Sequence, residues 1–383
     1  MLELGGAQQN TLYTVEHLDR GRFETILIAG PGGLLDDDAA RIPGLVFETC
    51  PWLRREVSPF ADLRAVVDLV RRLRRLRPDL VHTHSSKAGL LGRLAAAIVG
   101  VPVIVHTVHG WSFHSLLAPR RHACYVALES FGATLGSALV SVSHADAAEG
   151  HRYGIAPLGA FEIIRSGVRL AEFGRPEDRG YLRRELGLAE GVPLVGMIAC
   201  LKPQKAPLDF VALAERVGRE RKDVHFVLAG DGELRGSVER ALGSTALGER
   251  FHLLGWRRDP QRILADLDLF VLTSRHEGLP RVIPEARACG KAIVATAVNG
   301  SPEALVNGRH GYLCEPGDVE ALARRTQELL AAPALRCQMG QWAREGLLEW
   351  DIDEMVRRQE LLYDRLCAQA GLPSAGGSTR ESR

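Results

Sequence analysis

The sequence predicts an α/β protein built from two halves, each with a mostly parallel β-sheet wrapped by helices. Two observations lead to this prediction. Short apolar runs rich in β-branched residues alternate with helical patterns, and a Gly- and Pro-bearing joint at residues 187–193 separates two such series. The chain has 383 residues, which is long enough for two domains of ordinary size. We therefore expect two doubly wound units that bind ligands at the carboxyl ends of their strands.

The first series opens with a helical pattern that has no strand before it. Its strand candidates are residues 25–29, 80–84, 101–107 and 138–143, and its helical patterns are residues 8–18, 61–76, 88–99 and 118–136. Gly5 and Gly6 precede the first helical pattern and resemble a turn that approaches a phosphate. Only four residues precede this turn, too few for the central strand of such a domain. Either the domain lacks its first strand or the true start lies upstream, and we expect the second because neighbouring ladders need a partner.

The second series begins after the joint. Its strand candidates are residues 194–199, 224–229, 251–254, 267–272 and 292–295, with helical patterns at 207–220, 233–242, 259–265 and 281–289, followed by 319–331, 333–348 and 353–370. We expect an N-terminal domain over residues 1–186 and a second domain over residues 187–349. A closing helix at 350–370 is expected to pack back on the first domain. The Gly- and Ser-rich tail, residues 371–383, has a composition typical of disorder.

Composition limits the classes of function. The formal net charge is +1, which argues against a dedicated nucleic-acid binder. No apolar run reaches the roughly 18 residues that span a bilayer, and the N-terminus has no basic region followed by an apolar one. The seven cysteines are dispersed without CxxC spacing, as is typical of reduced thiols. We expect a cytoplasmic protein.

A stretch with two glutamates carries the strongest signal for a site. The apolar run at residues 267–272 leads into a polar loop with Glu277, and a helical pattern starting near residue 280 carries Glu285. Both carboxylates can face a cleft at the carboxyl end of the strand. The backbone amides of Gly278 and Leu279 would point the same way and suit an anion.

Taken with Lys205, the Gly230-Asp231-Gly232 loop and the Gly5-Gly6 turn, this stretch resembles glycosyltransferase family 4. The resemblance covers nearly the whole chain and includes residues 81–89, 106–111, 300–303 and 311–313. It implies the GT-B fold, in which two Rossmann-like domains face each other across a cleft. It also implies transfer from a sugar nucleotide with retention at the anomeric carbon. No metal and no cofactor are implied, because the nucleotide sugar is a substrate.

The resemblance assigns roles to charged residues. Glu277 would bind the hydroxyls of the donor sugar and Glu285 the ribose hydroxyls, for which ionised carboxylates are strong acceptors. Lys205 would neutralise the leaving diphosphate. The family usually has Arg where this chain has Cys200, so one expected phosphate cation is absent, and Lys202 could substitute.

Other positions follow from the same resemblance. His109 would face the donor sugar near the reaction centre, and Gly5 and Gly6 would approach the diphosphate or the donor sugar. The family usually has Gly where this chain has Ala206.

The nucleotide side is expected to include two further loops. Gly230 and Gly232 would lie on a nucleotide-side loop, although they form only part of a dinucleotide fingerprint and are weak evidence for NAD. Gly255 and Trp256 would lie near the base. Trp256 is equally compatible with a packed core aromatic.

Two patterns are compatible with metal binding. His82 and His84 share a face of one strand, but no third ligand is nearby in the sequence. Asp266-Leu-Asp268 resembles an acidic metal motif but leads directly into a buried strand. We expect structural or acceptor-side roles for the histidines and no metal site.

Basic residues of the first half are compatible with an anionic membrane surface. One predicted helix carries Arg71, Arg72, Arg74, Arg75 and Arg77, and Arg120-Arg121 begin another. Such clusters either bind anionic lipid or form a solvated face. Trp111, Phe113 and the Leu116-Leu117 pair could receive a lipid-linked acceptor, which favours peripheral association with the inner face of the cell membrane.

The expected function is transfer of a hexose or N-acetylhexosamine from a nucleoside-diphosphate sugar, expected to be UDP-linked. The acceptor would be a glycan or lipid-linked intermediate of cell-surface polysaccharide or lipopolysaccharide synthesis. Three alternatives stay open. They are a sugar-nucleotide 2-epimerase of the same fold, a catalytically weak nucleotide-sugar binding protein, and a Rossmann-type dehydrogenase.

Overall fold

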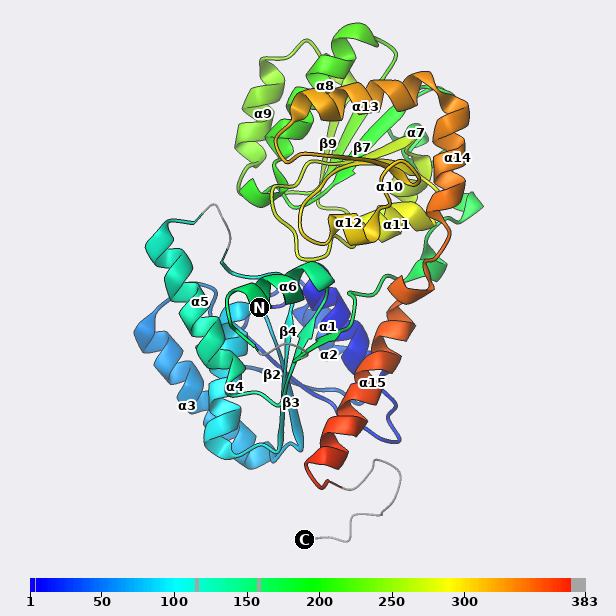
Figure 1. Cartoon of the computed structure of the whole chain (residues 1–383). Coiled ribbons are helices and arrows are strands. Elements are labelled where there is room, and N and C mark those ends of the chain that lie inside the picture. The colour runs from blue at the N-terminus through cyan, green and yellow to red at the C-terminus, as the bar shows by residue number, and fades with distance from the viewer. Residues whose placement is uncertain (4, 114–116, 157–159, 373–383) are drawn as a thin grey trace. The chain divides into compact units, whose positions relative to one another are not determined.

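The computed structural model describes residues 1–3, 5–113, 117–156 and 160–372. The chain divides into two compact units (Figure 1). Unit 1 combines Met1–Gly167 with the segment that starts at Ile352, and unit 2 is Val168–Asp351. The sequence placed the domain boundary at residue 186, whereas this division falls between Gly167 and Val168. Residues 187–193 lie inside unit 2, between α7 (Tyr181–Glu185) and β7 (Leu194–Ile198).

The strands of unit 1 form two parallel sheets. One pairs β1 (Ile26–Ala29) with β2 (Val46–Thr49). The other has the order β3 (Leu80–His84), β4 (Val103–Val108), β5 (Ala138–Ser141) and β6 (Phe161–Ile163). No ladder joins β1 to β3 among the described strands. All pairs are parallel, so their carboxyl ends lie at one edge of each sheet.

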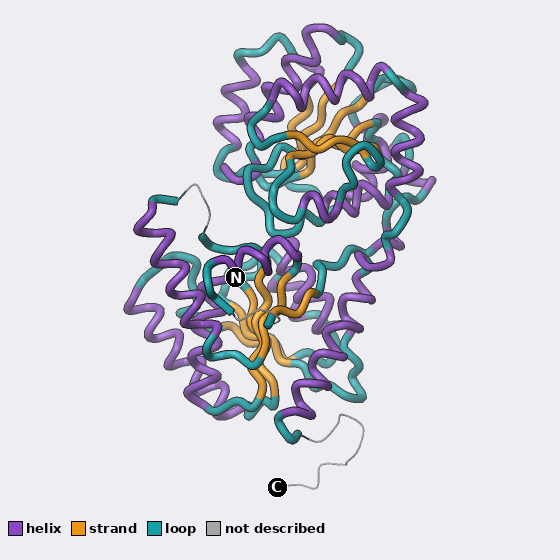
Figure 2. Tube along the Cα trace, in the orientation of Figure 1, coloured by secondary structure: helices purple, strands orange, loops and turns teal. Residues whose placement is uncertain are grey.

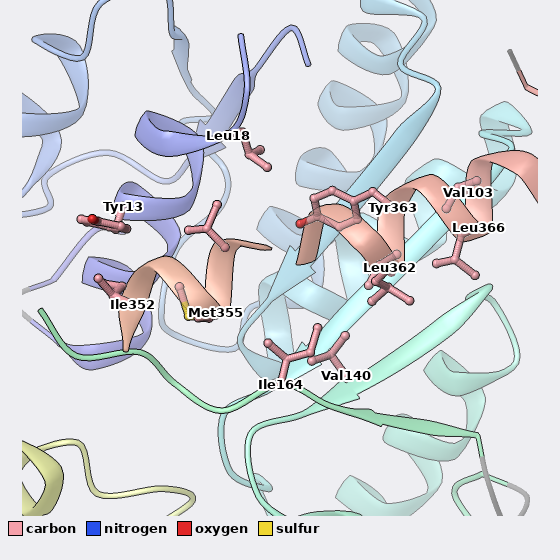
Figure 3. Close-up of a cluster of buried hydrophobic side chains, with 12 residues drawn as sticks. Tyr13, Leu18, Val103, Val140, Ile164, Ile352, Met355, Leu362, Tyr363 and Leu366 are labelled. Atoms are coloured by element: carbon pink, nitrogen blue, oxygen red, sulfur yellow. The ribbon is translucent and has the colours of Figure 1, made fainter. Parts of the chain in front are cut away.

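Helices surround these strands, as the tube in Figure 2 shows. The helices of unit 1 are α1 (Gly6–His17), α2 (Asp36–Ala40), α3 (Pro59–Leu76), α4 (Ser86–Val99), α5 (Pro119–Ala133), α6 (His144–Arg152) and α15 (Ile352–Gln369). The last helix of the chain belongs to the core of this unit. Tyr13 of α1 donates a hydrogen bond of 2.5 Å to Asp353 of α15. Tyr363 and Leu366 pack with Val103 and Val140 of the sheet (Figure 3). Residues from both ends of the chain therefore close one core.

Unit 2 has one six-stranded parallel sheet with the order β12-β11-β10-β7-β8-β9. Besides β7, its strands are β8 (His225–Ala229), β9 (Phe251–Gly255), β10 (Leu269–Leu272), β11 (Ala292–Thr296) and β12 (Gly311–Cys314). Besides α7, its helices are α8 (Pro207–Glu220), α9 (Arg235–Gly243), α10 (Pro260–Asp266), α11 (Val282–Ala288), α12 (Ser301–Ala304), α13 (Val319–Ala331) and α14 (Pro333–Ala343). The strand order reverses between β7 and β10, which is the position where such sheets bind ligands.

The predicted fold class, two doubly wound α/β units with parallel sheets, is confirmed. The strands predicted at 80–84, 194–199 and 292–295 are present with nearly the same bounds. The short strands β2, β6 and β12 were not predicted, because they are three or four residues long and most of their residues are only partly buried. From residue 373 on, the predicted disordered tail lies outside the described residues.

Candidate functional site

The site in unit 2 is built on the loops that follow two neighbouring strands. β7 and β10 pair directly, so these loops leave the same edge of the sheet. The Thr273 hydroxyl, one residue after β10, donates to the Ala206 carbonyl at 2.9 Å. The backbone N–H of Arg275 donates to the Gln204 carbonyl at 2.7 Å. These bonds hold the loop after β10 against the short 3₁₀ turn η3 (Pro203–Lys205) that follows β7.

This connection places Lys205 on Glu277. Lys205 Nζ donates to both carboxylate oxygens of Glu277, at 2.5 and 2.6 Å, and the Ser274 hydroxyl donates to Glu277 Oε1 at 2.5 Å. Glu277 is 4% exposed, whereas the Lys205 side chain keeps 22% of its surface. Two or more short hydrogen bonds between opposite charges offset part of the cost of burying them. The structure thus brings together two residues that lie 72 positions apart.

Glu285 lies on α11, in a different environment. Its carboxylate faces Arg281 at 3.7 Å, one helical turn earlier. Burial raises the pKa of Glu285, and the Arg281 guanidinium opposes that rise. Burial likewise lowers the pKa of Arg281. The helix begins at Val282, two residues after the predicted start near residue 280. The backbone amides of Gly278 and Leu279 stay a predicted anion contact.

The glycine loop after β8 lies against the loop after β7. Gly230 has φ +138°, and a Cβ there would lie 1.9 Å from the Ala199 carbonyl oxygen. Gly232 has φ +156° and would meet Leu201 in the same way. Only glycine fits both the backbone angles and these approaches. The N–H of Gly230 donates to the Gly255 carbonyl at 2.8 Å, so Gly255 borders the same loop.

The roles that the resemblance implies for four neighbouring positions stay predictions. Ala206 has φ +46°, a left-handed conformation that explains why glycine is usual there. Lys202 and Cys200 belong to the same turn, since the Lys202 N–H donates to the Cys200 carbonyl at 2.8 Å. A phosphate role for Lys202 stays a prediction. Trp256 is 46% exposed, so the alternative of a packed core aromatic is wrong.

In unit 1, His109 follows β4 directly and contacts another histidine. His84 Nδ1 lies 3.0 Å from His109 Nε2. Gly6 is the first residue of α1, and Gly5 precedes it with φ −131°, an extended angle open to any residue. The backbone of Gly5 therefore does not require glycine, and its proposed contact with the donor stays a prediction.

The two metal-like patterns have structural partners. His82 contacts the Tyr363 hydroxyl at 2.6 Å and the Thr107 hydroxyl at 2.7 Å. Asp266 accepts from the backbone N–H groups of Gly180 and Arg183 at the start of α7. Asp268 accepts from the N–H of Leu194 and from the guanidinium of Arg183, both at 2.8 Å. These carboxylates anchor α7 to the sheet.

One expectation about the acceptor is wrong. Trp111 and Phe113 are buried in a cluster with Val108 and Ile155, and Trp111 Nε1 donates to the Asp146 carbonyl at 2.7 Å. Neither ring can receive a lipid without unpacking the unit. Leu116 lies outside the described residues.

A shallow hollow of about 720 Å³ is lined by residues of α7 and of the loop before α10, and its lining includes neither Glu277 nor Glu285. Three of its charged lining residues are paired with one another: Arg257 contacts Glu185 at 2.5 Å and Asp259 at 2.7 Å. Ser274 is the functional neighbour that the sequence reasoning missed. A serine directly after a buried strand and three residues before the loop glutamate was the available signal.

Comparisons with known proteins identify the family of the chain. The family model described as Glycosyltransferase Family 4 matches residues 4–172, and that described as Glycosyl transferases group 1 matches residues 192–332. A UDP-Gal:alpha-D-GlcNAc-diphosphoundecaprenol alpha-1,3-galactosyltransferase from Escherichia coli is 34% identical over 333 residues, which cover 85% of this chain and 86% of that protein. An N,N'-diacetylbacillosaminyl-diphospho-undecaprenol alpha-1,3-N-acetylgalactosaminyltransferase from Campylobacter jejuni is 26% identical over 323 residues, covering 82% and 84%.

Solved structures show the same fold. HepE from Anabaena in complex with UDP superposes with a TM-score of 0.77 at 21% identity, covering 95% of this chain and 98% of that chain. WaaG, a glycosyltransferase involved in lipopolysaccharide biosynthesis, gives a TM-score of 0.74 at 15% identity, covering 97% of each chain. Both support two Rossmann-like domains of the GT-B type.

Proposed function

The chain belongs to glycosyltransferase family 4, and we propose that it transfers a hexose or N-acetylhexosamine from a UDP-sugar, with retention, to a lipid-linked glycan intermediate. It is a glycosyltransferase with the GT-B fold. Two of its relatives are named for transfer to diphosphoundecaprenol-linked sugars, and the one from E. coli is named for UDP-Gal. These names support a UDP-hexose donor and a polyprenyl-diphosphate-linked acceptor for this chain.

The contact between Lys205 and Glu277 carries the proposal. A carboxylate held by a lysine and a serine is oriented and retains acceptor capacity for the hydroxyls of a sugar. The partly exposed ammonium of Lys205 can at the same time reach a diphosphate bound at the switch point of the sheet. The Lys205–Glu277 pair can therefore contact both the sugar and the diphosphate, and it would favour a nucleotide sugar over a nucleotide that has no sugar.

The reaction proposed here needs no covalent intermediate. The bond between the anomeric carbon and the diphosphate oxygen breaks, and the acceptor oxygen attacks the same face. The acceptor hydroxyl gives its proton to the leaving diphosphate oxygen. Lys205 stabilises the charge that develops on that diphosphate, which is the role that a metal ion plays in other transferases. Without the arginine expected at Cys200, Lys205 carries more of this task.

A donor panel tests the proposal. The purified chain is offered UDP-, GDP- and dTDP-hexoses and N-acetylhexosamines with a polyprenyl-diphosphate-linked sugar, in EDTA, and the anomeric configuration is read by NMR. We expect one UDP-sugar to be used, and Glu277→Ala and Lys205→Ala to lower kcat/KM by on the order of 10²-fold or more. Full activity of both variants would remove the site from the reaction.

Calorimetry and acceptor-free controls separate the alternatives. A 2-epimerase would convert the UDP-sugar without acceptor, and a weak binding protein would bind UDP without turnover. Binding of NAD alone would indicate a dehydrogenase. A transferase should bind UDP in the calorimeter. In the activity assay, it should release UDP from the donor at the same rate as the acceptor is glycosylated.

We also propose that unit 1 contacts an anionic membrane surface through α3. The structure divides the arginines of this helix into two sets. Arg72 contacts Glu48 at 2.5 Å and Asp68 at 2.9 Å, and Arg75 also contacts Glu48. Arg71 and Arg74 are exposed and face outward. The basic face is therefore smaller than the sequence indicated.

Apolar residues extend the same outward stripe of α3. Phe60, Leu63 and Val67 are 65%, 64% and 43% exposed, and they precede Arg71 and Arg74 at helical spacing. An exposed apolar stripe followed by arginines fits the boundary between acyl chains and anionic headgroups. No helix within the described residues is long and apolar enough to cross a membrane.

Vesicle sedimentation tests this contact. We expect the chain to bind phosphatidylglycerol vesicles and not pure phosphatidylcholine, and Arg71→Glu/Arg74→Glu or Phe60→Ser/Leu63→Ser to abolish binding. Arg216→Glu, an exposed position on α8 of unit 2, is the matched control. Equal binding by all variants would contradict the assignment to α3.

A further inference from the structure

The loop after β10, which carries Glu277, is attached to both neighbouring strands of the sheet. β10 lies between β7 and β11. On the β7 side, the Thr273 hydroxyl donates to the Ala206 carbonyl at 2.9 Å. On the β11 side, the Thr296 hydroxyl donates to the Ser274 carbonyl at 2.6 Å. Two consecutive residues of the loop are therefore held from opposite sides, just before the segment that leads to Glu277.

Thr296 is the last residue of β11, and it is 0% exposed. Leu272 of β10 pairs with Ala295, so Thr296 lies one residue beyond the paired end of β10 and meets the loop instead. The Leu272 carbonyl is 3.5 Å from the Thr296 hydroxyl, at the limit of a hydrogen bond. Because a hydroxyl has one proton to donate, the short bond to Ser274 is the main hydrogen bond that Thr296 donates.

Ser274 passes this restraint on to Glu277. It is also 0% exposed, and its hydroxyl donates to Glu277 Oε1 at 2.5 Å. The other partner of the carboxylate, Lys205, has a flexible four-carbon stem, so its ammonium can follow the carboxylate to other positions. The Ser274 side chain is short and starts from a backbone that Thr296 holds. Of the two partners, the serine therefore determines where the carboxylate lies.

A second contact with the segment after β11 holds the other side of Glu277. The backbone N–H of Gly300 donates to the Gly278 carbonyl at 3.1 Å. A Cβ at Gly300 would lie 2.4 Å from the same carbonyl oxygen, so the two loops touch directly. Glu277 itself is 4% exposed. Residues of β11 and of the loop that follows it thus anchor the chain before and after Glu277, which favours a single conformation of this loop.

We propose that Thr296 is a positioning residue of the glycosyl transfer: through Ser274 it holds the Glu277 carboxylate in the orientation that binds the donor sugar. This inference rests on the proposed function, in which Glu277 accepts hydrogen bonds from the sugar hydroxyls. Thr296 is too deeply buried to contact the donor itself. Loss of its hydroxyl removes the restraint on the Ser274 carbonyl. A carboxylate that is in place only part of the time binds the sugar less well.

Calorimetry and kinetics of Thr296→Val test the proposal, because valine is also branched at Cβ and lacks only the hydroxyl. UDP has no sugar that could contact Glu277, so its Kd should stay within about 2-fold. The Kd for UDP-galactose, or for the other UDP-sugar that the donor panel selects, should rise by about 5- to 10-fold, and kcat/KM should fall by about 10-fold. Thr296→Ser restores the hydroxyl and should recover most of both values.

Thr326→Val is the matched control for a general effect on the fold. Thr326 of α13 is likewise 0% exposed, and its hydroxyl donates to the Leu322 carbonyl of the same helix at 2.8 Å. Both substitutions remove a buried hydrogen bond from unit 2, so both should lower thermal stability. Only Thr296→Val should raise the ratio of the Kd for the UDP-sugar to the Kd for UDP. The same ratio in both variants would overturn the proposal.

A double-mutant cycle tests whether Thr296 acts through Glu277. In a Glu277→Ala background no carboxylate remains to be positioned. Adding Thr296→Val should therefore change the Kd for the UDP-sugar by less than about 2-fold. A further rise as large as in the wild-type background would show that Thr296 affects donor binding by another route, and the proposal would be wrong.

The outcomes separate this inference from the proposed function. If Glu277→Ala weakens binding of the UDP-sugar and Thr296→Val does not, only the positioning role fails. If Glu277→Ala changes neither this binding nor activity, the role of Glu277 in the proposed function fails and the inference fails with it. Should Thr296→Val not fold, Thr296→Ser and Thr296→Cys decide. A thiol is a weaker donor than a hydroxyl, so the proposal requires the serine variant to bind the UDP-sugar more tightly, and equal Kd values would contradict it.

Discussion

The strands of unit 1 and unit 2 form parallel sheets in both units, but the side chains at their carboxyl ends differ in charge. In unit 1, burial lowers the pKa values of His82, His84 and His106, so that edge presents neutral rings and hydroxyls. In unit 2, the corresponding edge presents the ionic contact between Lys205 and Glu277. The difference shows two responses to burial. An isolated base gives up its charge, whereas opposite charges compensate each other.

The two edges therefore suit different chemical tasks. Ionic groups can bind a diphosphate and compensate charge that develops on it. Neutral rings can align hydroxyls without attracting the diphosphate.

The largest expected effect comes from breaking the ionic contact of unit 2. Glu277→Gln keeps the size of the side chain and removes its charge, so Lys205 loses its ionic partner and the sugar loses a strong acceptor. We expect kcat/KM to fall by on the order of 10²- to 10³-fold in a donor-saturation assay. Glu239→Gln, an exposed glutamate on α9 that contacts Arg235, is the control and should stay near wild type. Wild-type turnover by Glu277→Gln would abolish the contrast between the units.

Acidification makes unit 1 charged. Unfolded histidines bind a proton below about pH 6.5, whereas folded His84 does so only near pH 4. The unfolded state takes up more protons in this window, so stability is full above about pH 6.5 and is lost as the pH falls toward 4. At about 1.4 kcal/mol per pKa unit, His84 accounts for a loss of up to about 3 kcal/mol. Urea denaturation of the whole chain between pH 7 and 4 measures it.

The variant His84→Asn serves as the reference for this titration. Because Asn has no ionisable group, the unfolding free energy of this variant should fall less steeply between pH 6.5 and 4 than that of the wild type. Burial also lowers the pKa of His310 in unit 2 to about 4. Because His310 is present in both proteins, its contribution to the pH dependence cancels in the comparison. Arg357 and Arg358 lower the pKa of Glu354 to about 2, so its contribution is lost only at more acidic pH. Identical slopes for both proteins would show that His84 is not a buried neutral base.

Within unit 2, a carboxylate with a structural role sharpens the contrast. Asp266 is buried and accepts from the backbone N–H groups that begin α7. Asp266→Ala leaves these donors unsatisfied, and we expect a loss of about 2 kcal/mol in the free energy of unfolding. Calorimetric binding of UDP should be unchanged at a temperature where the variant is folded. A selective loss of UDP binding would instead place Asp266 in the site.

The smallest effect is expected at Ala206. Its left-handed conformation costs an alanine about 1 kcal/mol, and glycine adopts it freely but loses more chain entropy on folding. These terms nearly cancel, so Ala206→Gly should change the unfolding free energy by less than about 1 kcal/mol and keep UDP affinity. A large destabilisation, read from the urea midpoint, would mean that the Ala206 methyl group packs better than its backbone angle indicates.

Much of the fold could be predicted from the sequence because buried strands of a parallel sheet are continuous apolar runs. The run at residues 269–272 is an example, and it also located the loop with Glu277. The strand β6 was not predicted, because its residues are only partly buried and do not form a continuous apolar run. The predicted contact of Trp111 with a lipid-linked acceptor was wrong for a related reason. The local sequence of an aromatic residue next to a glycine does not show whether its ring lies in a core or on a surface.

The sequence by itself determined the α/β alternation, the positions of most strand ends and the residue types available for chemistry there. Those properties follow from local periodicity and from the order of residues along the chain. Only the tertiary structure decided which of these residues meet. Lys205 reaches Glu277 because β7 and β10 are neighbours, and His84 reaches His109 because β3 and β4 are neighbours. Strand order and burial are properties of the assembled sheet, so the ionic contact and the neutral histidine pair emerge only there.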